Sequence, residues 1–502
     1  MMLNKLIKSD TVLLSILVLF LVTLYSYISV QGFWHDEIHT LAFIRGIDIY
    51  PFPDSDFINI TKFESVRWFK SLLELDNFSS NFYRNIIHEG HPPLYYLLLK
   101  IWTFVFGCTE SGLRSFSLFT SLISLIFFSK IIKLITGEKN NIYTLLLAVS
   151  PFFVYYSIEA RSYSLYFLLS TITIYFALKH LTAPLKNQKS TYIILAGLFS
   201  VLLMYTHYYG VFIYFILAII ISVKCFEKET FYKSIRLLIP LILFLPWLYI
   251  VKKQTNAHSI HWTDGKLSLS DSITEFIYNS IDLLISPDGC IEQVEIIVLS
   301  FSITLLLINF ILSDKFGIKN MLLFTLIYFF YGLEIIVFDF ILDHHTIAIS
   351  RYYFPLLIFL LLAIIYCLKY GRYKWLNWMI LLMILPITIG KSYDVICANS
   401  AKKQMYRETA NFIDENYNPN DVKIVICPHG PTSLGIAYYL NKDFSIKGID
   451  VNDLCNEYLL DSTLIIEQKL GVNTEPWNVD CGKEYINLTK INFIGIDLVK
   501  EK

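Results

Sequence analysis

The sequence predicts an all-α polytopic membrane protein of about eleven transmembrane helices, with interfacial helices in its first outer loop and a small C-terminal α/β extracytoplasmic domain. Of its 502 residues, 55% are hydrophobic and only 17% are charged, whereas roughly a quarter of the residues in a soluble domain are charged. Apolar runs long enough to cross a bilayer, which takes about 20 helical residues, recur from residue 11 to residue 393. The composition then changes, which predicts a domain boundary between 1–393 and 394–502. The net charge of −1 and the absence of a basic face exclude nucleic acid as a partner.

The first apolar stretch, Thr11 to Val30, is predicted to be a retained membrane helix. It follows Lys5 and Lys8 as the hydrophobic part of a signal peptide would. That part of a signal peptide is shorter, however, and is followed by small residues at a cleavage site. Here the run has about twenty residues and ends in QGFWHDE.

Loops rich in Lys and Arg indicate the side of the membrane on which each connection lies, because cytoplasmic loops collect these residues. Five such loops, all predicted inside, span 130–141, 179–190, 224–236, 313–320 and 369–374. With the N-terminus also inside, the predicted helices lie near 11–31, 113–133, 142–158, 162–179, 191–206, 208–223, 237–251, 292–312, 321–338, 352–368 and 375–392. The sequence therefore predicts a multi-pass protein of the cell (plasma) membrane with a cytoplasmic N-terminus and an extracytoplasmic C-terminal segment.

The segment 91–107 is apolar but is predicted to lie in the outer interface. It has about seventeen residues, with Lys100 in its middle and Trp102 beside it, which suits an interfacial amphipathic helix. A membrane crossing is the alternative, but it would move every later loop to the other side and invert the charge pattern. The first outer loop is therefore predicted to span 31–112.

The C-terminal segment is predicted to contain both helices and strands. Helices are expected at 404–416 and 432–440, and strands at 422–427, 462–468 and 491–499. The segment has neither a phosphate loop nor a nucleophile elbow, which favours a structural or acceptor-facing role.

Cysteine and histidine spacings imply no cofactor. The eight cysteines show no spacing typical of a metal site. Cys455 and Cys481 are able to pair if their region lies in an oxidising compartment, and the sequence leaves their state open. His258 and His261 have an i, i+3 spacing that permits a metal site on a helix without implying one. A divalent metal is compatible with this pattern but not required by it.

The acidic pair Asp36 and Glu37 is the strongest candidate for chemistry. It follows the first helix by a few residues, beside Trp34 and two histidines. Two adjacent carboxylates near a membrane can act as base and positioning group, because desolvation and like charge raise one pKa while hydrogen bonds lower the other. The alternative is a solvated loop start whose tryptophan anchors the interface.

Basic residues map to the same predicted outer face. His91 begins the interfacial helix, where it could contact an anion. Glu159 and Arg161 lie in a short outer turn, either as an ion pair or with Arg161 binding a phosphate, which its planar fork suits. His207, in THYYG, and Arg351, in SRYYFP, lie at further outer turns. A site at this face has no access to cytoplasmic nucleotides, so the donor of a transferred group would have to be borne by a lipid.

Five motifs occur together in a characteristic order: FWHDE, GHPPLYYLLLKIWTFVFG followed by ESGLRSFSLF, SPFFVYYSIEARSYSLYFLL, LLMYTHYYG and SRYYFPLL. In this combination the chain resembles the bacterial members of the GT-C glycosyltransferase superfamily, which are related to protein O-mannosyltransferases and lipid A aminoarabinose transferase. The resemblance is clearest over residues 10 to 220.

The resemblance implies a transmembrane catalytic domain that uses a polyprenyl-phosphate sugar as donor, with a lipid, glycan or protein as acceptor and inversion at the anomeric carbon. It assigns Asp36 as the catalytic base with Glu37 beside it, and places His91 near the donor phosphate. His207 falls where some relatives have a lysine. The chain departs from the pattern at Tyr163, where several relatives have Asp, and at Gly90, where the aminoarabinose enzyme has an acid; Glu89 lies one position earlier. These departures leave the sugar unidentified.

Three other functional classes are alternatives to a glycosyltransferase. A transporter or flippase would show internal repeats and helices broken by Gly or Pro at the bilayer midplane, and the polar residues here gather at one face instead. A polymerase or ligase of lipid-linked glycans typically carries one large late outer loop, whereas the longest membrane-proximal loop here is the first. A non-catalytic scaffold is the third alternative.

Overall fold

A computed structural model describes the chain in segments. The described residues are 10–47, 62–137, 141–183, 190–227, 236–255, 263–285, 293–312, 318–397, 401–427, 430–449, 463–468, 484–491 and 494–500. Two compact units are present, one made of residues 1–27, 89–98 and 112–398, and the other of residues 28–88, 99–111 and 399–502. We call them the helical unit and the mixed unit. His258, His261, Cys455 and Cys481 lie outside the described residues.

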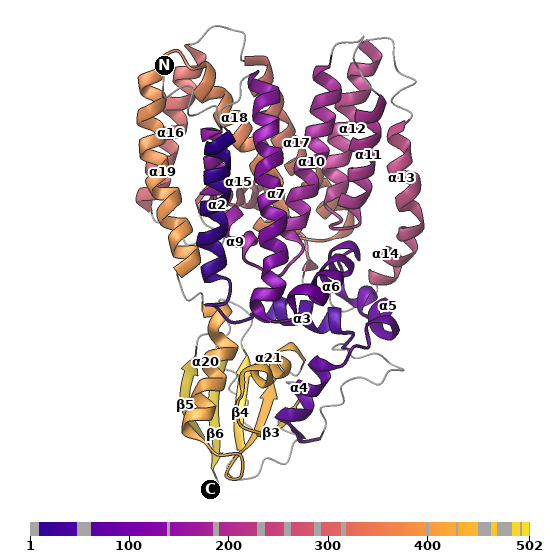
Figure 1. Cartoon of the computed structure of the whole chain (residues 1–502), viewed down its shortest axis with the longest axis vertical. Coiled ribbons are helices and arrows are strands. Elements are labelled where there is room, and N and C mark those ends of the chain that lie inside the picture. The colour runs from indigo at the N-terminus through magenta and orange to yellow at the C-terminus, as the bar shows by residue number, and fades with distance from the viewer. Residues whose placement is uncertain are drawn as a thin grey trace. The chain divides into compact units, whose positions relative to one another are not determined.

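The helical unit is a bundle in which long helices run alongside one another (Figure 1). Its elements are α2 (Asp10–Tyr27), α7 (Glu110–Thr136), α8 (Ile142–Ala148), α9 (Pro151–Ser157), α10 (Tyr163–Thr182), α11 (Ser190–Met204), α12 (Gly210–Glu227), α13 (Leu238–Phe244), η3 (Leu245–Trp247), α14 (Leu248–Gln254), α15 (Leu269–Ile285), α16 (Gln293–Ile311), α17 (Ile318–Leu342), η5 (Thr346–Ala348), η6 (Ser350–Tyr353), α18 (Leu356–Tyr370) and α19 (Lys374–Cys397).

Among the described residues, six helices are long and apolar enough to cross a membrane: α2, α7, α10, α16, α17 and α19. Four shorter helices, α6 (Leu94–Phe106), α11, α12 and α18, are also apolar. The protein is therefore a multi-pass membrane protein with a mostly helical fold. The larger number of crossings that the sequence suggests stays a prediction.

Two predicted helices are interrupted by proline. The stretch 142–158 forms α8 and α9 instead of one helix, because Pro151 lacks an N–H and Ser150 before it is extended. The stretch 237–251 forms α13, η3 and α14, with Pro246 in the short 3-10 turn. Helix α15 lies between the predicted membrane helices 237–251 and 292–312, where no membrane helix was predicted. Its buried positions include the polar residues Ser272 and Asn279.

The mixed unit combines most of the first loop with the C-terminal segment. The loop contributes α3 (His35–Arg45), β1 (Glu64–Ser65), α4 (Val66–Glu74), α5 (Phe78–Glu89) and part of α6. The C-terminal segment contributes α20 (Ala401–Asn416), β2 (Lys423–Cys427), α21 (Pro431–Tyr439), β3 (Ser445–Gly448), β4 (Thr463–Gln468), β5 (Glu484–Ile491) and β6 (Ile494–Lys500). The contacts thus group the loop with the C-terminal segment, whereas the composition change predicts a boundary at residue 393.

The described strands of this unit form one sheet in the order β1-β3-β2-β4-β6-β5. Strand β2 pairs in parallel with β3 and β4, while β1, β5 and β6 pair in antiparallel fashion. Helix α21 joins β2 to β3. The central strand β2 is buried on both faces, since Ile424, Val425 and Ile426 are each 0% exposed. Strand β1 comes from the first loop, so the sheet contains residues from both ends of the chain.

Helix α3 carries the acidic pair and has a clear start and end. It begins at Trp34 with a capping box, in which the Glu37 side chain accepts from the Trp34 N–H. It ends at Gly46, whose φ of 70° lies in the left-handed region that glycine adopts without strain. A Cβ at Gly46 would lie 2.4 Å from the carbonyl carbon of Asn77, so the chain also packs too closely there for a side chain.

Candidate functional site

The helical unit brings the predicted basic residues into one cluster around His207. His207 lies in the turn between α11 and α12 and is 3% exposed. Its ring centroid is 5.5 Å from that of His91 and 5.2 Å from that of Tyr352. The charges of His91, Arg351 and Arg161 all act on it. We call His91, Arg161, His207 and Arg351 the basic cluster.

The tautomer of His207 follows from its hydrogen bonding. The Tyr209 N–H donates to Nδ1 over 3.3 Å, so the proton of the neutral ring lies on Nε2. Nε2 is buried and has no hydrogen-bond partner among the described residues. Burial, and then the positive charges of His91, Arg351 and Arg161, hold the pKa of His207 well below its usual value. His207 is therefore a neutral, buried N–H donor beside cationic groups.

The turn that holds His207 depends on a close approach of two helices. The Gly210 N–H donates to the His207 carbonyl over 2.9 Å. A Cβ at Gly210 would lie 2.7 Å from Cγ of Leu203, so only glycine fits where α12 begins against α11. The local sequence HYYG thus fixes where the imidazole lies.

Arg161 is held in the turn between α9 and α10. Its side chain is 6% exposed, and Nη1 donates to the Tyr96 hydroxyl over 3.4 Å. The Arg161 N–H donates to the Glu159 carbonyl, which also accepts from Ser117 Oγ over 2.5 Å. Glu159 is itself 1% exposed. The predicted pair Glu159 and Arg161 therefore lies in one buried turn, and the guanidinium belongs to the basic cluster.

Arg351 belongs to the short 3-10 turn η6, where its guanidinium lies over two rings. Its Cζ atom is 6.0 Å from the Tyr163 ring centroid and 5.9 Å from that of Tyr352. Such cation–π contacts keep a guanidinium in place while leaving its N–H groups directed away from the ring. The Tyr163 ring thus supports the Arg351 guanidinium.

Further side chains that were not predicted from the sequence hold the segment around Arg351. Asp339 Oδ2 accepts from the Ile347 N–H over 2.7 Å, and its Oδ1 accepts from Thr346 Oγ1 over 2.5 Å. Asn279 on α15 donates to the Ile347 carbonyl over 2.8 Å. Asp339 lies inside the apolar helix α17, and an ionisable residue in such a helix is a signal that could have marked it.

The acidic pair lies in the mixed unit, where its two members have different environments. Glu37 is 0% exposed, and its Oε2 accepts from the Trp34 N–H over 3.4 Å. Asp36 is half-buried in the first turn of α3, where the helix dipole favours a negative charge. His35 and His39 flank it, with ring centroids 4.8 Å apart. Glu37 thus has a structural contact, while Asp36 has the more accessible carboxylate.

Among the described residues, no group of three or more His, Cys, Asp or Glu side chains is arranged to hold a metal ion. Among the described residues, Cys108, Cys367 and Cys397 are free cysteines.

Residues 90–250 match the family model described as dolichyl-phosphate-mannose-protein mannosyltransferase. That stretch contains His91, Arg161 and His207. No curated protein matches the chain.

Solved structures of one protein, ArnT, share its fold at low sequence identity. ArnT from Cupriavidus metallidurans in the apo state has a TM-score of 0.57 and 10% identity, covering 96% of this chain and 97% of that one. The same protein bound to undecaprenyl phosphate has a TM-score of 0.55 at 10% identity, with the same coverage. The oligosaccharyltransferase of Archaeoglobus fulgidus has a TM-score of 0.45 and 13% identity, covering 85% of this chain and 61% of that one. The matched segment and the ArnT-like fold confirm the resemblance to the GT-C superfamily of membrane glycosyltransferases.

Proposed function

We propose that this protein transfers a sugar from a polyprenyl-phosphate-linked donor to a hydroxyl of a lipid, glycan or protein acceptor at the outer face of the membrane. The observation that carries the proposal is the basic cluster, in which the buried Nε2–H of His207 lies beside two arginines. Such a group of donors suits a phosphate, which accepts several charge-assisted hydrogen bonds. ArnT from Cupriavidus metallidurans binds undecaprenyl phosphate, which supports the same class of lipid here.

In the proposed reaction, Asp36 removes the proton from the acceptor hydroxyl while the acceptor oxygen attacks the anomeric carbon of the sugar. The bond between that carbon and the phosphate oxygen breaks, and the polyprenyl phosphate leaves with the electron pair. Attack from the side opposite the leaving group inverts the anomeric centre. Arg161, His207, Arg351 and His91 stabilise the negative charge of the leaving phosphate. The proposed reaction changes no oxidation state and therefore needs no redox cofactor.

The neutral state of His207 suits this role. A further full positive charge next to Arg161 and Arg351 would be costly to bury, and it would also bind the released phosphate lipid too tightly. A neutral N–H donor contributes a hydrogen bond with a smaller cost of burial, and it binds the released lipid phosphate less tightly. We therefore propose that the two arginines supply positive charge to the phosphate, and that the imidazole supplies one oriented hydrogen bond.

The proposed orientation places the acidic pair and the basic cluster at the outer face, with the N-terminus in the cytoplasm. Helix α6 supports this threading, because its 13 residues rise only about 20 Å, less than the hydrocarbon core of about 30 Å. A cysteine introduced at Lys139 should resist an impermeant reagent added outside, while one at Thr109 should react. The opposite labelling would overturn the orientation.

To test the function, lipid-linked sugars are added to membranes that contain the protein. The amounts of donor lipid, free polyprenyl phosphate and glycan product are then measured. Cells with the protein should convert a polyprenyl-phosphate sugar to free polyprenyl phosphate and a new glycan, and cells without it should accumulate the donor. Asp36→Asn should abolish transfer while the protein still inserts and binds donor. Movement of the lipid-linked sugar across the bilayer without transfer would refute the proposal and support a flippase.

A further inference from the structure

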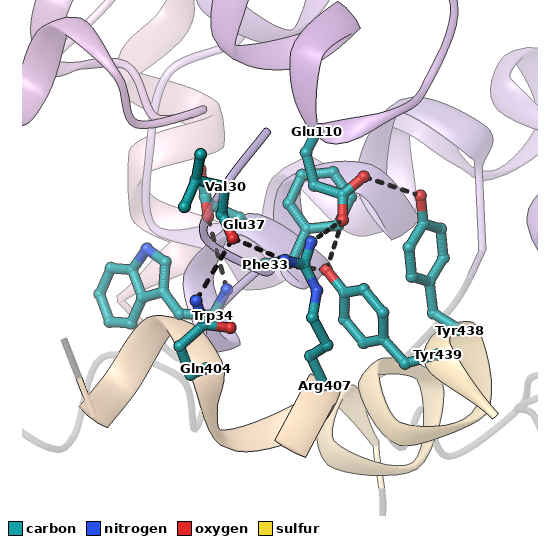
Figure 2. Close-up of polar contacts among 9 residues, drawn as sticks. All are labelled: Val30, Phe33, Trp34, Glu37, Glu110, Gln404, Arg407, Tyr438 and Tyr439. Atoms are coloured by element: carbon teal, nitrogen blue, oxygen red, sulfur yellow. Dashed lines mark hydrogen bonds and ion pairs between the residues drawn. The ribbon is translucent and has the colours of Figure 1, made fainter. Parts of the chain in front are cut away.

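The segment 30–34, which leads into α3, is held by side chains from distant parts of the mixed unit. Arg407 on α20 and Tyr439 at the end of α21 are hydrogen-bonded to its backbone, and the ring of Tyr438 packs against Phe33. Glu110 at the start of α7 is bonded to all three of these side chains. We call these four residues the Glu110 clamp. Figure 2 shows them gathered around the chain between Val30 and Trp34.

Glu110 is the centre of the clamp. Its Oε1 lies 2.9 Å from Nη2 of Arg407 and accepts a hydrogen bond from the Tyr439 hydroxyl over 2.7 Å. Its Oε2 accepts from the Tyr438 hydroxyl over 3.3 Å. One carboxylate thus connects both C-terminal helices. The Arg407 and Glu110 side chains are 27% and 13% exposed, so solvent screens this ion pair less than a surface pair.

The clamp contacts the backbone of the segment at both of its ends. Arg407 Nη1 donates to the Val30 carbonyl over 2.6 Å, and Gln404 on the same helix donates to that carbonyl over 3.3 Å. The Phe33 N–H donates to the Tyr439 hydroxyl over 2.6 Å. Backbone contacts of this kind fix where the chain runs, whichever side chains the segment carries.

Segment 30–34 also packs closely against α20 and α21. A Cβ at Gly32 would lie 2.9 Å from the Lys403 carbonyl oxygen and 3.1 Å from the Tyr439 hydroxyl, so the chain passes close against α20 and α21. Phe33 is 0% exposed, with its ring centroid 5.5 Å from that of Tyr438. The residue after Phe33 is Trp34, the N-cap of α3.

The protonation state of Tyr439 suits its place between two partners. Burial and then the charge of Glu110 raise its pKa, so the hydroxyl keeps its proton at neutral pH. It therefore donates that proton to Glu110 while accepting from the Phe33 N–H. A phenylalanine at this position would fill the same space but break both connections.

We propose that the Glu110 clamp positions Asp36. The clamp fixes the chain up to Phe33, Trp34 begins the helix, and Asp36 lies in the first turn of that helix, so the clamp sets where the carboxylate lies. His35, one residue before Asp36, is also held from α20, because its Nδ1 is 3.2 Å from the Tyr406 hydroxyl. The C-terminal helices α20 and α21 thereby act on the catalytic step indirectly, by fixing the backbone that leads to Asp36. This inference rests on the proposed role of Asp36 as base.

The test compares Tyr439→Phe and Glu110→Gln with the unaltered full-length protein in nanodiscs. In both variants the turnover number should fall about 10- to 100-fold, because a displacement of about 1 Å of a catalytic group has effects of that size. The KM for the lipid-linked donor should stay within about twofold, because none of the four clamp residues belongs to the basic cluster that is proposed to bind the donor phosphate. Hydrogen exchange at the Phe33 amide should accelerate in Tyr439→Phe.

A matched control removes another arginine–carboxylate pair between the first loop and the C-terminal segment. Arg67 Nε lies 3.2 Å from Asp443 Oδ2, and the Arg67 side chain is 84% exposed. Arg67→Met should leave both turnover and exchange at Phe33 unchanged. Equal losses in Arg67→Met and Tyr439→Phe would show a general effect on folding and overturn the positioning role.

The outcomes separate this inference from the proposed function. If Asp36→Asn abolishes transfer while both clamp variants keep full turnover, the positioning role is wrong and the base assignment stands. If Asp36→Asn keeps full turnover, the base assignment fails, and the positioning role that rests on it fails too. The exchange at Phe33 still reports, without any assay of activity, whether the clamp holds the segment.

Discussion

The imidazole of His207 stacks on the ring of Tyr166, with centroids 4.6 Å apart and planes inclined by 23°. The Tyr166 hydroxyl is in turn hydrogen-bonded to that of Tyr331 over 3.0 Å. Tyr166 and Tyr331 come from α10 and α17, which are far apart in sequence. The stack therefore fixes the plane of the imidazole and the direction in which its Nε2–H points.

Replacing His207 should weaken binding of the donor lipid. His207→Ala removes one hydrogen bond to a charged group, which corresponds to about a 10- to 100-fold rise in the Kd for undecaprenyl phosphate. Titration calorimetry in nanodiscs measures this change. Tyr166→Phe keeps the stacking ring and should alter the Kd much less. Unchanged binding in His207→Ala would remove the imidazole from the phosphate site.

Stability should depend on pH through His207. The pKa of His207 is lowered in the folded protein, so below about pH 6.5 the unfolded chain binds a proton that the folded chain does not. The free energy of unfolding should therefore fall as pH falls below about 6.5 and be constant, as far as His207 is concerned, above that pH. In His207→Gln the drop in Tm between pH 7.5 and pH 5 should be smaller. An equal drop in both proteins would contradict the neutral buried state.

Substitution of Asp36 should mainly lower activity, whereas substitution of Glu37 should mainly lower stability. Asp36→Asn should lower the transfer rate by about 10²- to 10⁴-fold, the usual contribution of a general base, without changing Tm. Glu37→Ala removes the acceptor of the capping box of α3 and should cost about 1 kcal/mol of stability while keeping part of the activity. A thermal unfolding scan beside a transfer assay distinguishes the two. The reverse pattern would make Glu37 the base.

Arg351 should not be replaceable by lysine. The Arg351 guanidinium lies over the rings of Tyr163 and Tyr352 and can still offer paired N–H groups, whereas an ammonium offers a single point charge. Arg351→Lys should raise the Kd for undecaprenyl phosphate about 10-fold, and Arg351→Met more. Binding assays on the unaltered protein, Arg351→Lys and Arg351→Met measure the order of their Kd values. Full binding by Arg351→Met would show that this arginine only supports the fold.

Two glycines with similar backbones provide a matched test of packing in the mixed unit. Gly46 and Gly107 have φ values of 70° and 75°, but a Cβ at Gly46 would meet Asn77 at 2.4 Å and one at Gly107 would meet nothing within 4 Å. Gly107→Ala should cost about 1 kcal/mol from backbone strain alone. Gly46→Ala should cost more, because Asn77 must also move. Chemical unfolding of both variants measures the difference, and equal losses would show that the Asn77 contact is easily relieved.

The sequence was most informative where a local pattern determines the structure. The helices and strands of the C-terminal segment that it predicts, such as 404–416 and 422–427, correspond to α20 and β2, because their apolar periodicity is strong. The basic cluster was foreseen as residues at one face. Its members were recognisable because arginine and histidine are rare next to apolar helices.

Features that depend on distant residues could not be read in this way. Phe33 and Tyr439 are separated by 406 positions, and nothing in the local sequence links them. Strand β1 has two residues, too few for any alternating pattern. Asn279 supports the Arg351 segment only because α15 folds back beside it, which follows from tertiary packing and not from the sequence of α15.

The pairing of β1 with β3 has a consequence for how the protein is made. Glu64 pairs with Ile446 and Ser65 with Ser445, so the first loop must wait for the last part of the chain before this edge of the sheet can form. At a synthesis rate of about 5 to 20 residues per second, the interval is roughly 20 to 80 s. During that time the ribosome inserts the intervening helices into the bilayer. The mixed unit is therefore assembled after translation of almost the whole chain, and a nascent chain truncated before residue 445 leaves β1 without its partner strand.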